Sequence, residues 1–316
     1  MHEMITIGET MVSLVSREHK RLQYGPALGM YIAGAESNTA IGVRKLGHSA
    51  TFITRIGDDS LGQFILRMIR AEGVDTSYVK VDPEYPTGIM YKEALPNNKT
   101  AVHYYRENSA ASRLNISDIP KETITKAKII HLTGITPVLS ESCRQMVFDV
   151  MDIAVSGGCA ISFDPNIRKK LWKNHDHSPL MKELISRSSY VLIGLKEASE
   201  LYGTDDVKRL SDLIFSSGMV QFIAIKNGSK GAWVCDHFQQ LIIPPVPCNS
   251  IDSVGAGDAF NAGFLTGVLE KRPLEECGSI GAIAGALATE TKGDIEGLPS
   301  RQDIQNVQDN IRMVLR

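Results

Sequence analysis

The most informative stretch of this sequence reads Asp252-Ser253-Val254-Gly255-Ala256-Gly257-Asp258, and Ala259-Phe260 continue it into a tract typical of a helix. Small residues at positions 255–257 let the backbone approach a ligand closely. Their N–H groups would lie at a helix N-terminus, where unpaired donors and the helix dipole favour an anion. The carboxylate of Asp258 beside this anion hole can accept a proton from an attacking hydroxyl group. The stretch therefore predicts an anion hole next to a general base, an arrangement that suits phosphoryl transfer.

The alternative interpretation of this stretch is a glycine-rich turn whose aspartate caps the helix. The full heptapeptide, placed after an extended segment and before a long helix of small residues, favours the anion hole. Two other phosphate-binding patterns do not occur in the sequence: Gly-x-x-x-x-Gly-Lys-Ser/Thr, and Gly-x-Gly-x-x-Gly after an opening strand. A Walker-type NTPase and a dinucleotide-binding Rossmann unit are therefore disfavoured.

The composition is that of an ordinary globular enzyme of 316 residues with a formal net charge of −2. A near-neutral chain without a block of like charges argues against nucleic acid or an anionic membrane as the main partner. The five cysteines are odd in number and lack Cys-x-x-Cys spacing, which favours free thiols in a reducing compartment. The N-terminal residues do not resemble a signal peptide, and no apolar run approaches the ~20 residues that span a bilayer. We therefore expect a cytoplasmic protein.

Short apolar runs alternate with amphipathic stretches, a pattern typical of βαβ units and a mainly parallel sheet with helices on both faces. The expected elements include strands at Met4–Gly8 and Ala50–Ile56 and a helix from about Leu274 to Lys292. Two segments, at about 10–33 and 87–106, break the alternation. Extended pieces without crossover helices suit either a hairpin at the sheet edge or a small sheet that closes over a substrate. We predict a single α/β domain over residues 1–316, with a lid formed by these two segments.

Two further segments suit a ligand site. The loop Ile225-Lys226-Asn227-Gly228-Ser229-Lys230-Gly231-Ala232 follows a strand, and its glycines can approach a nucleotide, although the loop also reads as a hairpin turn. The second segment is Ala33-Gly34-Ala35-Glu36-Ser37-Asn38. Gly34 can admit a substrate to the backbone, and Asn38 can hydrogen-bond a hydroxyl group. The alternative is a helix start that Ser37 caps.

These residues together resemble the ribokinase-like (PfkB) family of sugar kinases, over nearly the whole chain. One signature comprises Ala33–Ala40, Leu46-Gly47 and Ile56-Gly57-Asp58-Asp59-x-Leu61-Gly62, and the other is Asp252–Phe260. Each signature is specific, and their order and separation agree with the family pattern. The resemblance implies a three-layer ribokinase-like fold, with a mostly parallel central sheet flanked by helices and a small β-sheet lid.

Within the family, the sequence looks most like kinases of 2-keto-3-deoxygluconate. The segments that carry this likeness are Ala33–Asn38, Tyr104–Ser112, Phe163–Arg168 and Gly293–Pro299. The likeness implies that ATP phosphorylates the terminal hydroxyl of the sugar acid to give its 6-phosphate, with Asp258 as catalytic base. The implied substrate-binding residues are Gly34, Asn38, Tyr91, Tyr104, Arg106, Arg168, Asp258 and Asp294. The two arginines suit the substrate carboxylate, because a guanidinium fork pairs bidentately with a carboxylate.

For the nucleotide, the resemblance implies contacts from Asn166, Lys226, Gly228, Ser229 and Gly231, with Gly255, Ala256 and Gly257 as the anion hole for the phosphates. Glu197 matches the acidic end of the family's Asn-x-x-Glu motif, which implies that it holds Mg²⁺ through water. This motif reads Gly194-Leu195-Lys196-Glu197 here, and Ala282 stands where many members place an adenine-contacting asparagine. A monovalent cation near Asp252 occurs in some relatives and is left open.

Several alternatives stay open at this stage. The chain could be another sugar kinase of the family, such as a fructokinase or a 5-keto-2-deoxygluconate kinase. A nucleoside kinase would need an aromatic clamp for the base, for which Tyr91, Tyr104 and Tyr105 are the candidates. A regulator that binds sugar or nucleotide without catalysis is a different class, and the intact Asp258 motif argues against it. Because lid strands present an exposed sheet edge, we also expect a homo-oligomer formed through them.

Overall fold

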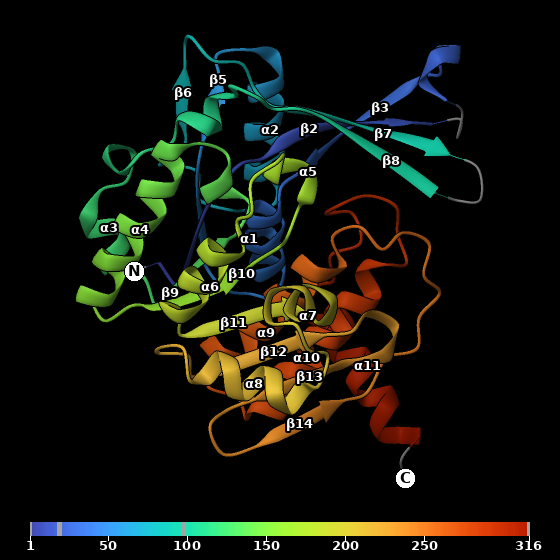
Figure 1. The fold of residues 1–316 in the computed structure, drawn as a ribbon. Coiled ribbons are helices and arrows are strands. Elements are labelled where there is room, and N and C mark those ends of the chain that lie inside the picture. The colour runs from blue at the N-terminus through green and yellow to red at the C-terminus, as the bar shows by residue number, and fades with distance from the viewer. Residues whose placement is uncertain (1, 18–20, 96–98, 315–316) are drawn as a thin grey trace.

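The computed structural model describes residues 2–17, 21–95 and 99–314, and within them eight strands form a central sheet (Figure 1). In spatial order the strands are β14 (Gln240–Ile243), β13 (Ala232–Cys235), β12 (Phe222–Lys226), β11 (Tyr190–Gly194), β10 (Ala160–Asp164), β9 (Ile129–Thr133), β1 (Met4–Ile7) and β4 (Ala50–Ile53). The strands from β12 to β4 run parallel, whereas β13 and β14 are antiparallel. The expected α/β fold with a mostly parallel sheet is confirmed.

Helices cover both faces of this sheet, because successive strand residues point to opposite sides. Met4, Phe52 and Ile129 pack on one face, and Ile5, Ile130 and Ile161 pack on the other. The first face is covered by α1 (Ala35–Lys45), α2 (Ser60–Ala71), α9 (Ala256–Leu269), α10 (Leu274–Ala288) and α11 (Arg301–Val314). The second face is covered by α3 (Lys121–Thr125), α4 (Glu141–Ser156), α5 (Lys169–Trp172), α6 (Ser178–Ser186), α7 (Leu195–Tyr202) and α8 (Val207–Phe215). The central strands are therefore buried on both sides, which explains their continuous apolar runs.

A second, small sheet projects from the main body (Figure 1). Its order is β3 (Leu28–Ala33), β2 (Met11–Ser16), β7 (Ile89–Leu95) and β8 (Lys99–Tyr105). β2 pairs antiparallel with β3 and parallel with β7, and β7 pairs antiparallel with β8. These strands lie within the two segments that break the helix–strand alternation, although positions 18–20 and 96–98 of those segments lie outside the described residues. We refer to β3, β2, β7 and β8 together as the small sheet.

The prediction of a single strand over Ala50–Ile56 was wrong. β4 ends at Ile53, and β5 (Arg55–Gly57) pairs with β6 (Lys80–Asp82) in a separate two-stranded sheet. The reason is electrostatic: the Arg55 guanidinium donates to the carboxylates of Asp118 at 2.8 Å and Asp82 at 3.1 Å. These bonds hold the chain against β6 instead of letting it continue beside β1.

The last long helix of the core also ends earlier than expected, at Ala288 instead of Lys292. The Thr289 hydroxyl donates to the Ala286 carbonyl oxygen at 2.7 Å and closes the helix. Gly293 then adopts a φ of 116°, in the region that favours glycine, and the chain turns back toward the start of α9. This turn brings Asp294 into the cavity described below.

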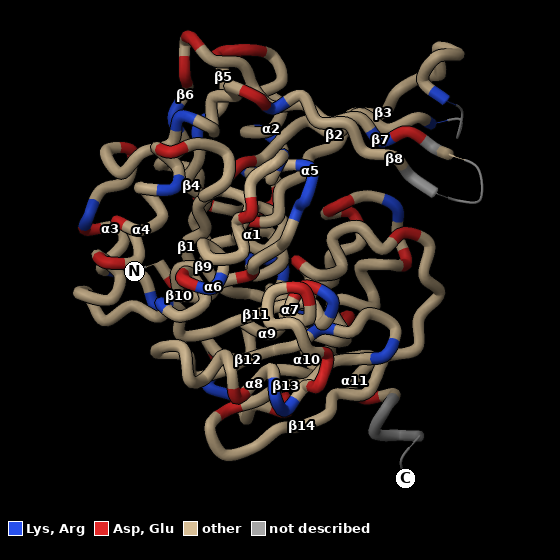
Figure 2. Tube along the Cα trace, viewed as in Figure 1, with Lys and Arg blue, Asp and Glu red and all other residues tan. Residues whose placement is uncertain are grey.

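Short 3-10 helices connect these elements: η1 (Leu22–Tyr24), η2 (Ala110–Arg113), η3 (Ile116–Asp118), η4 (Thr136–Val138) and η5 (Gly228–Lys230). Acidic and basic residues are interspersed along the trace (Figure 2), as a net charge of −2 leads one to expect. Among the helices of the described segments, none combines the length and the apolar character that crossing a membrane requires.

Candidate active site

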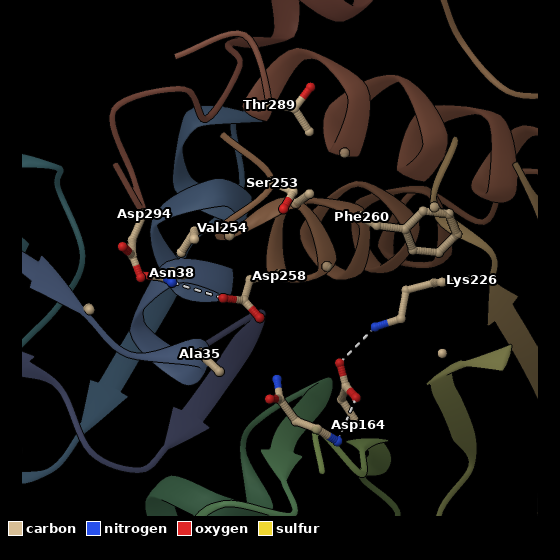
Figure 3. A pocket seen from close by; sticks show the side chains of 18 of the residues that line it. Ala35, Asn38, Asp164, Lys226, Ser253, Val254, Asp258, Phe260, Thr289 and Asp294 are labelled. Carbon is tan, nitrogen blue, oxygen red and sulfur yellow. Dashed lines mark hydrogen bonds and ion pairs between the residues drawn. The ribbon is translucent and has the colours of Figure 1, made fainter. Parts of the chain in front are cut away.

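A cavity of about 850 Å³ lies between the small sheet and the carboxyl ends of the parallel strands. Asp164 of β10, Gly194 of β11 and Lys226 of β12 contribute to its floor, and the segment that begins α9 forms one wall (Figure 3). The carboxyl ends of parallel strands are where open α/β sheets bind ligands. The fold therefore places the polar residues of three strands around one cavity.

The start of α9 requires glycine at position 255. Gly255 has a φ of 77° in the left-handed region, and a Cβ there would lie 2.5 Å from the backbone oxygen of Asp294. Residues 255–257 all line the cavity, and the helix begins at Ala256. The backbone at the N-terminus of α9 thus faces the cavity, where its N–H groups can meet an anion.

Asp258, in the first turn of α9, is buried at the cavity wall. Its Oδ2 accepts a hydrogen bond of 2.8 Å from Nδ2 of Asn38 on α1 (Figure 3). Burial raises the pKa of Asp258 to about 7, and the negative charge of Asp164 adds to this effect, while Asn38, Arg168 and Lys226 oppose it. A carboxyl group with a pKa near neutrality can take up and release a proton at physiological pH.

Asp164 and Lys226 form a buried polar cluster with Asn261 of α9. Nζ of Lys226 lies 2.8 Å from Oδ2 of Asp164 and 3.0 Å from Oδ1 of Asn261, and Asn261 also donates to Asp164 at 2.7 Å. Burial alone would raise the pKa of Asp164, but Lys226 and Asn261 outweigh it and hold that pKa below its ordinary value. Sequence reasoning missed Asp164 and Asn261 as site residues; the signal for Asp164 was a carboxylate at the end of an apolar strand.

Glu197 and Asn166 offer oxygen atoms at the same end of the cavity. The two carboxylate oxygens of Glu197 accept backbone N–H groups, from Ile167 at 2.7 Å and from Gly194 at 2.9 Å. Burial, together with the charge of Asp164, raises the pKa of Glu197. Oδ1 of Asn166 is buried and finds no hydrogen-bond partner among residues 2–17, 21–95 and 99–314. Because the described chain holds no cluster of three or more His, Cys, Asp or Glu ligands, any metal here would keep water or substrate ligands.

The two arginines expected to bind the substrate differ in their surroundings. Arg106 is 7% exposed and already paired: its Nε lies 2.7 Å and its Nη2 2.5 Å from Oε2 of Glu9. Glu9 is buried too, and its other oxygen accepts the Ser109 hydroxyl at 2.5 Å. Arg168, in contrast, is exposed and lines the cavity. Glu9 was missed from the sequence because it lies 97 positions from Arg106 and no local pattern links the two.

Tyr91 is the candidate residue that the structure does not bring to the cavity. Its neighbours in β7, Met90 and Lys92, line the cavity instead. Since alternate residues of a strand face opposite sides, Tyr91 lies on the other face of the small sheet, where it stacks edge-to-face with Tyr105 at 5.2 Å between ring centroids. Tyr105 is 66% exposed, which marks that face as the outer one.

Every other candidate from the sequence lines the cavity: Gly34, Asn38, Tyr104, Arg106, Asn166, Arg168, Glu197, Lys226, Gly228, Ser229, Gly231, Gly255, Ala256, Gly257, Asp258 and Asp294. A Cβ at Gly34 would lie 2.5 Å from the backbone oxygen of Glu9, so the wall is closed to larger residues there. The loop with Gly228 and Gly231 connects the antiparallel strands β12 and β13, so it is both a hairpin connection and part of the cavity. Ala282, Ala286 and Thr289 of α10 and its end complete the cavity on the side away from the small sheet.

The chain is similar over nearly its whole length to proteins that carry a name. The chain is 33% identical over 307 residues to a 2-dehydro-3-deoxygluconokinase of Bacillus subtilis (strain 168), covering 96% of this chain and 94% of the relative. It is 26% identical over 310 residues to a 5-dehydro-2-deoxygluconokinase of Geobacillus kaustophilus (strain HTA426), covering 96% and 92%. A candidate ribokinase II of E. coli, solved in complex with ATP and Mg²⁺, shares the fold with a TM-score of 0.89 at 22% identity, covering 98% of this chain and all of that one.

The family model described as pfkB family carbohydrate kinase matches residues 1–301, so the relationship extends over both signatures and the segment between them. The expectation drawn from those signatures is confirmed, and the chain belongs to the pfkB family of carbohydrate kinases.

Proposed function

We propose that this chain transfers the γ-phosphoryl group of ATP to the terminal hydroxyl of 2-keto-3-deoxygluconate, giving the 6-phosphate and ADP. The observation that carries the proposal is the position of Asp258, a buried carboxyl group in the first turn of α9, directly beside the glycine-rich backbone of residues 255–257. The name of the B. subtilis relative supports the choice of sugar acid, and the E. coli structure supports ATP and Mg²⁺.

In the proposed step, ionised Asp258 accepts the proton of the substrate hydroxyl as its oxygen attacks the γ-phosphorus. The bond from that phosphorus to the bridging oxygen of ADP breaks, and ADP leaves with the electron pair. Backbone N–H groups of residues 255–257 and the ammonium of Lys226 stabilise the charge on the phosphoryl oxygens. Asn38 holds the base in place through its 2.8 Å hydrogen bond.

The residues near β10 and β11 fit a Mg²⁺ ion that stays partly hydrated. The unpartnered Oδ1 of Asn166 is a direct oxygen ligand of the kind Mg²⁺ accepts, and Glu197, whose oxygens already accept backbone N–H groups, suits contact through water. When bound, Mg²⁺ neutralises charge on the ATP phosphates.

The acid end of the substrate would lie under the small sheet, which we propose acts as a lid. Arg168 is exposed at the cavity and can pair with a carboxylate, whereas Arg106, fixed by Glu9, offers the guanidinium nitrogen that Glu9 does not use. This arrangement favours a sugar acid over a neutral hexose. It does not separate 2-keto-3-deoxygluconate from 5-keto-2-deoxygluconate, and the Geobacillus relative makes the latter the second candidate.

A coupled assay of ADP formation over four acceptors tests the proposal: 2-keto-3-deoxygluconate, 5-keto-2-deoxygluconate, fructose and adenosine. We expect the highest kcat/KM with the first. A preference for 5-keto-2-deoxygluconate would keep the sugar-acid site but change the substrate. Preference for fructose or adenosine would overturn the carboxylate argument. If no ADP forms with any of the four acceptors, a regulator without catalysis would be favoured.

We further propose that the protein forms a homo-oligomer through the small sheet. The outer side of this sheet exposes Leu28, Met30 and Tyr105, at 37%, 44% and 66%, and β3 and β8 are its edge strands. Exposed apolar edges of this kind favour pairing with a second copy. Light scattering should show a mass above 34.6 kDa that falls in Tyr105→Glu; a monomeric wild-type protein would refute this proposal.

A further inference from the structure

A buried ion pair joins the small sheet to the loop that follows α10. The ammonium of Lys92 on β7 hydrogen-bonds to Oδ1 of Asp294, and both side chains are only 8% exposed. The two residues lie 202 positions apart, and both line the cavity. Removing one partner of such a pair leaves an uncompensated buried charge, so the pair must separate at a cost if the small sheet moves away.

Asp294 is also in contact with the reaction centre. Its backbone oxygen packs against Gly255, where a Cβ would come within 2.5 Å, and its carboxyl group lies beside the amide of Asn38, which lowers the pKa of Asp294. Asn38 is the residue that donates to Asp258, and Figure 3 shows its amide between the two aspartates. Oδ1 of Asn38 is buried and has no partner among the described residues, so the side chain serves here as a donor to carboxyl groups. The contacts thus run without a break from Lys92 through Asp294 and Asn38 to Asp258.

We propose that Lys92 is a positioning residue that links closure of the small sheet to the catalytic carboxylate Asp258. It does so because its ammonium, carried on β7 of the small sheet, compensates the charge of Asp294. With the sheet closed, Asp294 is neutralised and Asn38 can direct its amide toward Asp258. With the sheet open, the Asp294 carboxylate has lost the lysine ammonium and competes with Asp258 for the amide of Asn38. Asp258 is then a ready base only when the substrate is enclosed. This inference rests on the proposed function, in which Asp258 takes the proton.

The charges around Asp258 set the direction of the effect. Asp164 at the end of β10 opposes ionisation of Asp258, while Arg168 after β10 and Lys226 of β12 favour it, and Asn38 of α1 stabilises the ionised form. Burial raises the pKa of Asp294, and the nearby Asp252 adds to that, while Lys92 and Asn38 oppose it. Loss of the Lys92 charge therefore leaves the Asp294 carboxylate, which lies beside Asn38, without its cation.

The test is the pH dependence of kcat/KM for the sugar acid in Lys92→Met, Lys92→Arg and the wild type. In Lys92→Met we expect the acid limb, where activity rises as Asp258 ionises, to move upward by roughly one pH unit, the size expected when one uncompensated negative charge, here that of Asp294, is left near Asp258 in a partly screened site. Lys92→Arg keeps the charge and should restore the wild-type limb. The matched control is Lys170→Met: Lys170 is exposed and also ties the small sheet to the main body, donating to the Val102 carbonyl oxygen at 2.8 Å, but it does not reach Asp294. Its limb should stay at the wild-type pH.

An acid limb in Lys92→Met that coincides with the wild type would overturn the inference, whatever happens to the rate. If Lys92→Met does not fold, as judged by circular dichroism, Asp294→Asn and Lys92→Met/Asp294→Asn replace it. Once Asp294 is neutral, the lysine has no charge to compensate, so the two limbs should coincide; a further shift in the double variant would count against the link. The proposed function fails separately, through substantial turnover in Asp258→Asn.

Discussion

Replacing Asn38 with leucine should shift the acid limb of catalysis upward without removing the base. In the wild type the pKa of Asp258 is raised to about 7, so about a tenth of the enzyme carries the ionised base at pH 6 and about half at pH 7. The 2.8 Å bond from Asn38 lowers that pKa, because it stabilises the charged form. Leucine has the same number and branching of side-chain heavy atoms as asparagine, although it is somewhat bulkier, and it has no hydrogen-bond donor.

The magnitude follows from the environment of this bond. A hydrogen bond to a buried charged group contributes about 1.5–3 kcal/mol, and one pKa unit corresponds to about 1.4 kcal/mol, so the limb should move by about one to two pH units. At pH 7 the variant should then retain about a fifth to a fiftieth of the wild-type rate, and at pH 9 most of the difference should disappear.

The assay is kcat against pH from 5.5 to 9.5 at saturating ATP, Mg²⁺ and sugar acid, in buffers of constant ionic strength. The pH dependence of the residual activity of Asp258→Asn serves as the control. Any dependence that comes from ionisation of ATP, and not of Asp258, would persist in that variant. A rate loss in Asn38→Leu that is the same at every pH would refute the reasoning, since it would mean that Asn38 affects substrate placement and not the base.

Three further changes have expected outcomes. Asp258→Asn should lower kcat by about 10²–10⁴-fold while nucleotide binding, measured by calorimetry, stays close to wild type, because the shape is kept and the base is lost; near-normal turnover would contradict the mechanism. Arg168→Ala should lower kcat/KM for 2-keto-3-deoxygluconate by about 10–100-fold, but much less for a neutral hexose, and an equal loss on both would remove the carboxylate argument. Gly8→Ala places a Cβ 2.2 Å from Cδ of the buried Glu36, so urea denaturation should show a loss of about 1–3 kcal/mol in the free energy of unfolding, and unchanged stability would mean that Glu36 has room to move.

The sequence was a good guide to features whose cause is local. The alternation of apolar and amphipathic runs reflects the period of strands and helices, and the glycine at 255 marks a backbone conformation, with a φ of 77°, that favours glycine. Both kinds of signal can be read without knowledge of distant contacts. The continuous strand expected at Ala50–Ile56 failed because Arg55 pairs with Asp82 and Asp118, and these partners become neighbours only in the folded chain.

The missed site residues have the same explanation. Glu9 meets Arg106, and Lys92 meets Asp294, across separations that leave no pattern in the sequence. The error at Tyr91 came from strand parity, since a shift of one residue exchanges the inner and outer faces of a strand.

The small sheet has a consequence for how new specificities arise. Its antiparallel strands β7 and β8 supply Met90, Lys92, Val102 and Tyr104 to the cavity, and Arg106 follows β8, whereas Asp258 and the glycine-rich backbone belong to the start of α9. In the proposed function, part of the acceptor site and the groups that transfer the phosphoryl group therefore lie in separate stretches of the sequence. Exchange of residues 89–106 between relatives would alter one side of that site while Asp258 stays in place, provided that the incoming segment keeps a cation at position 92.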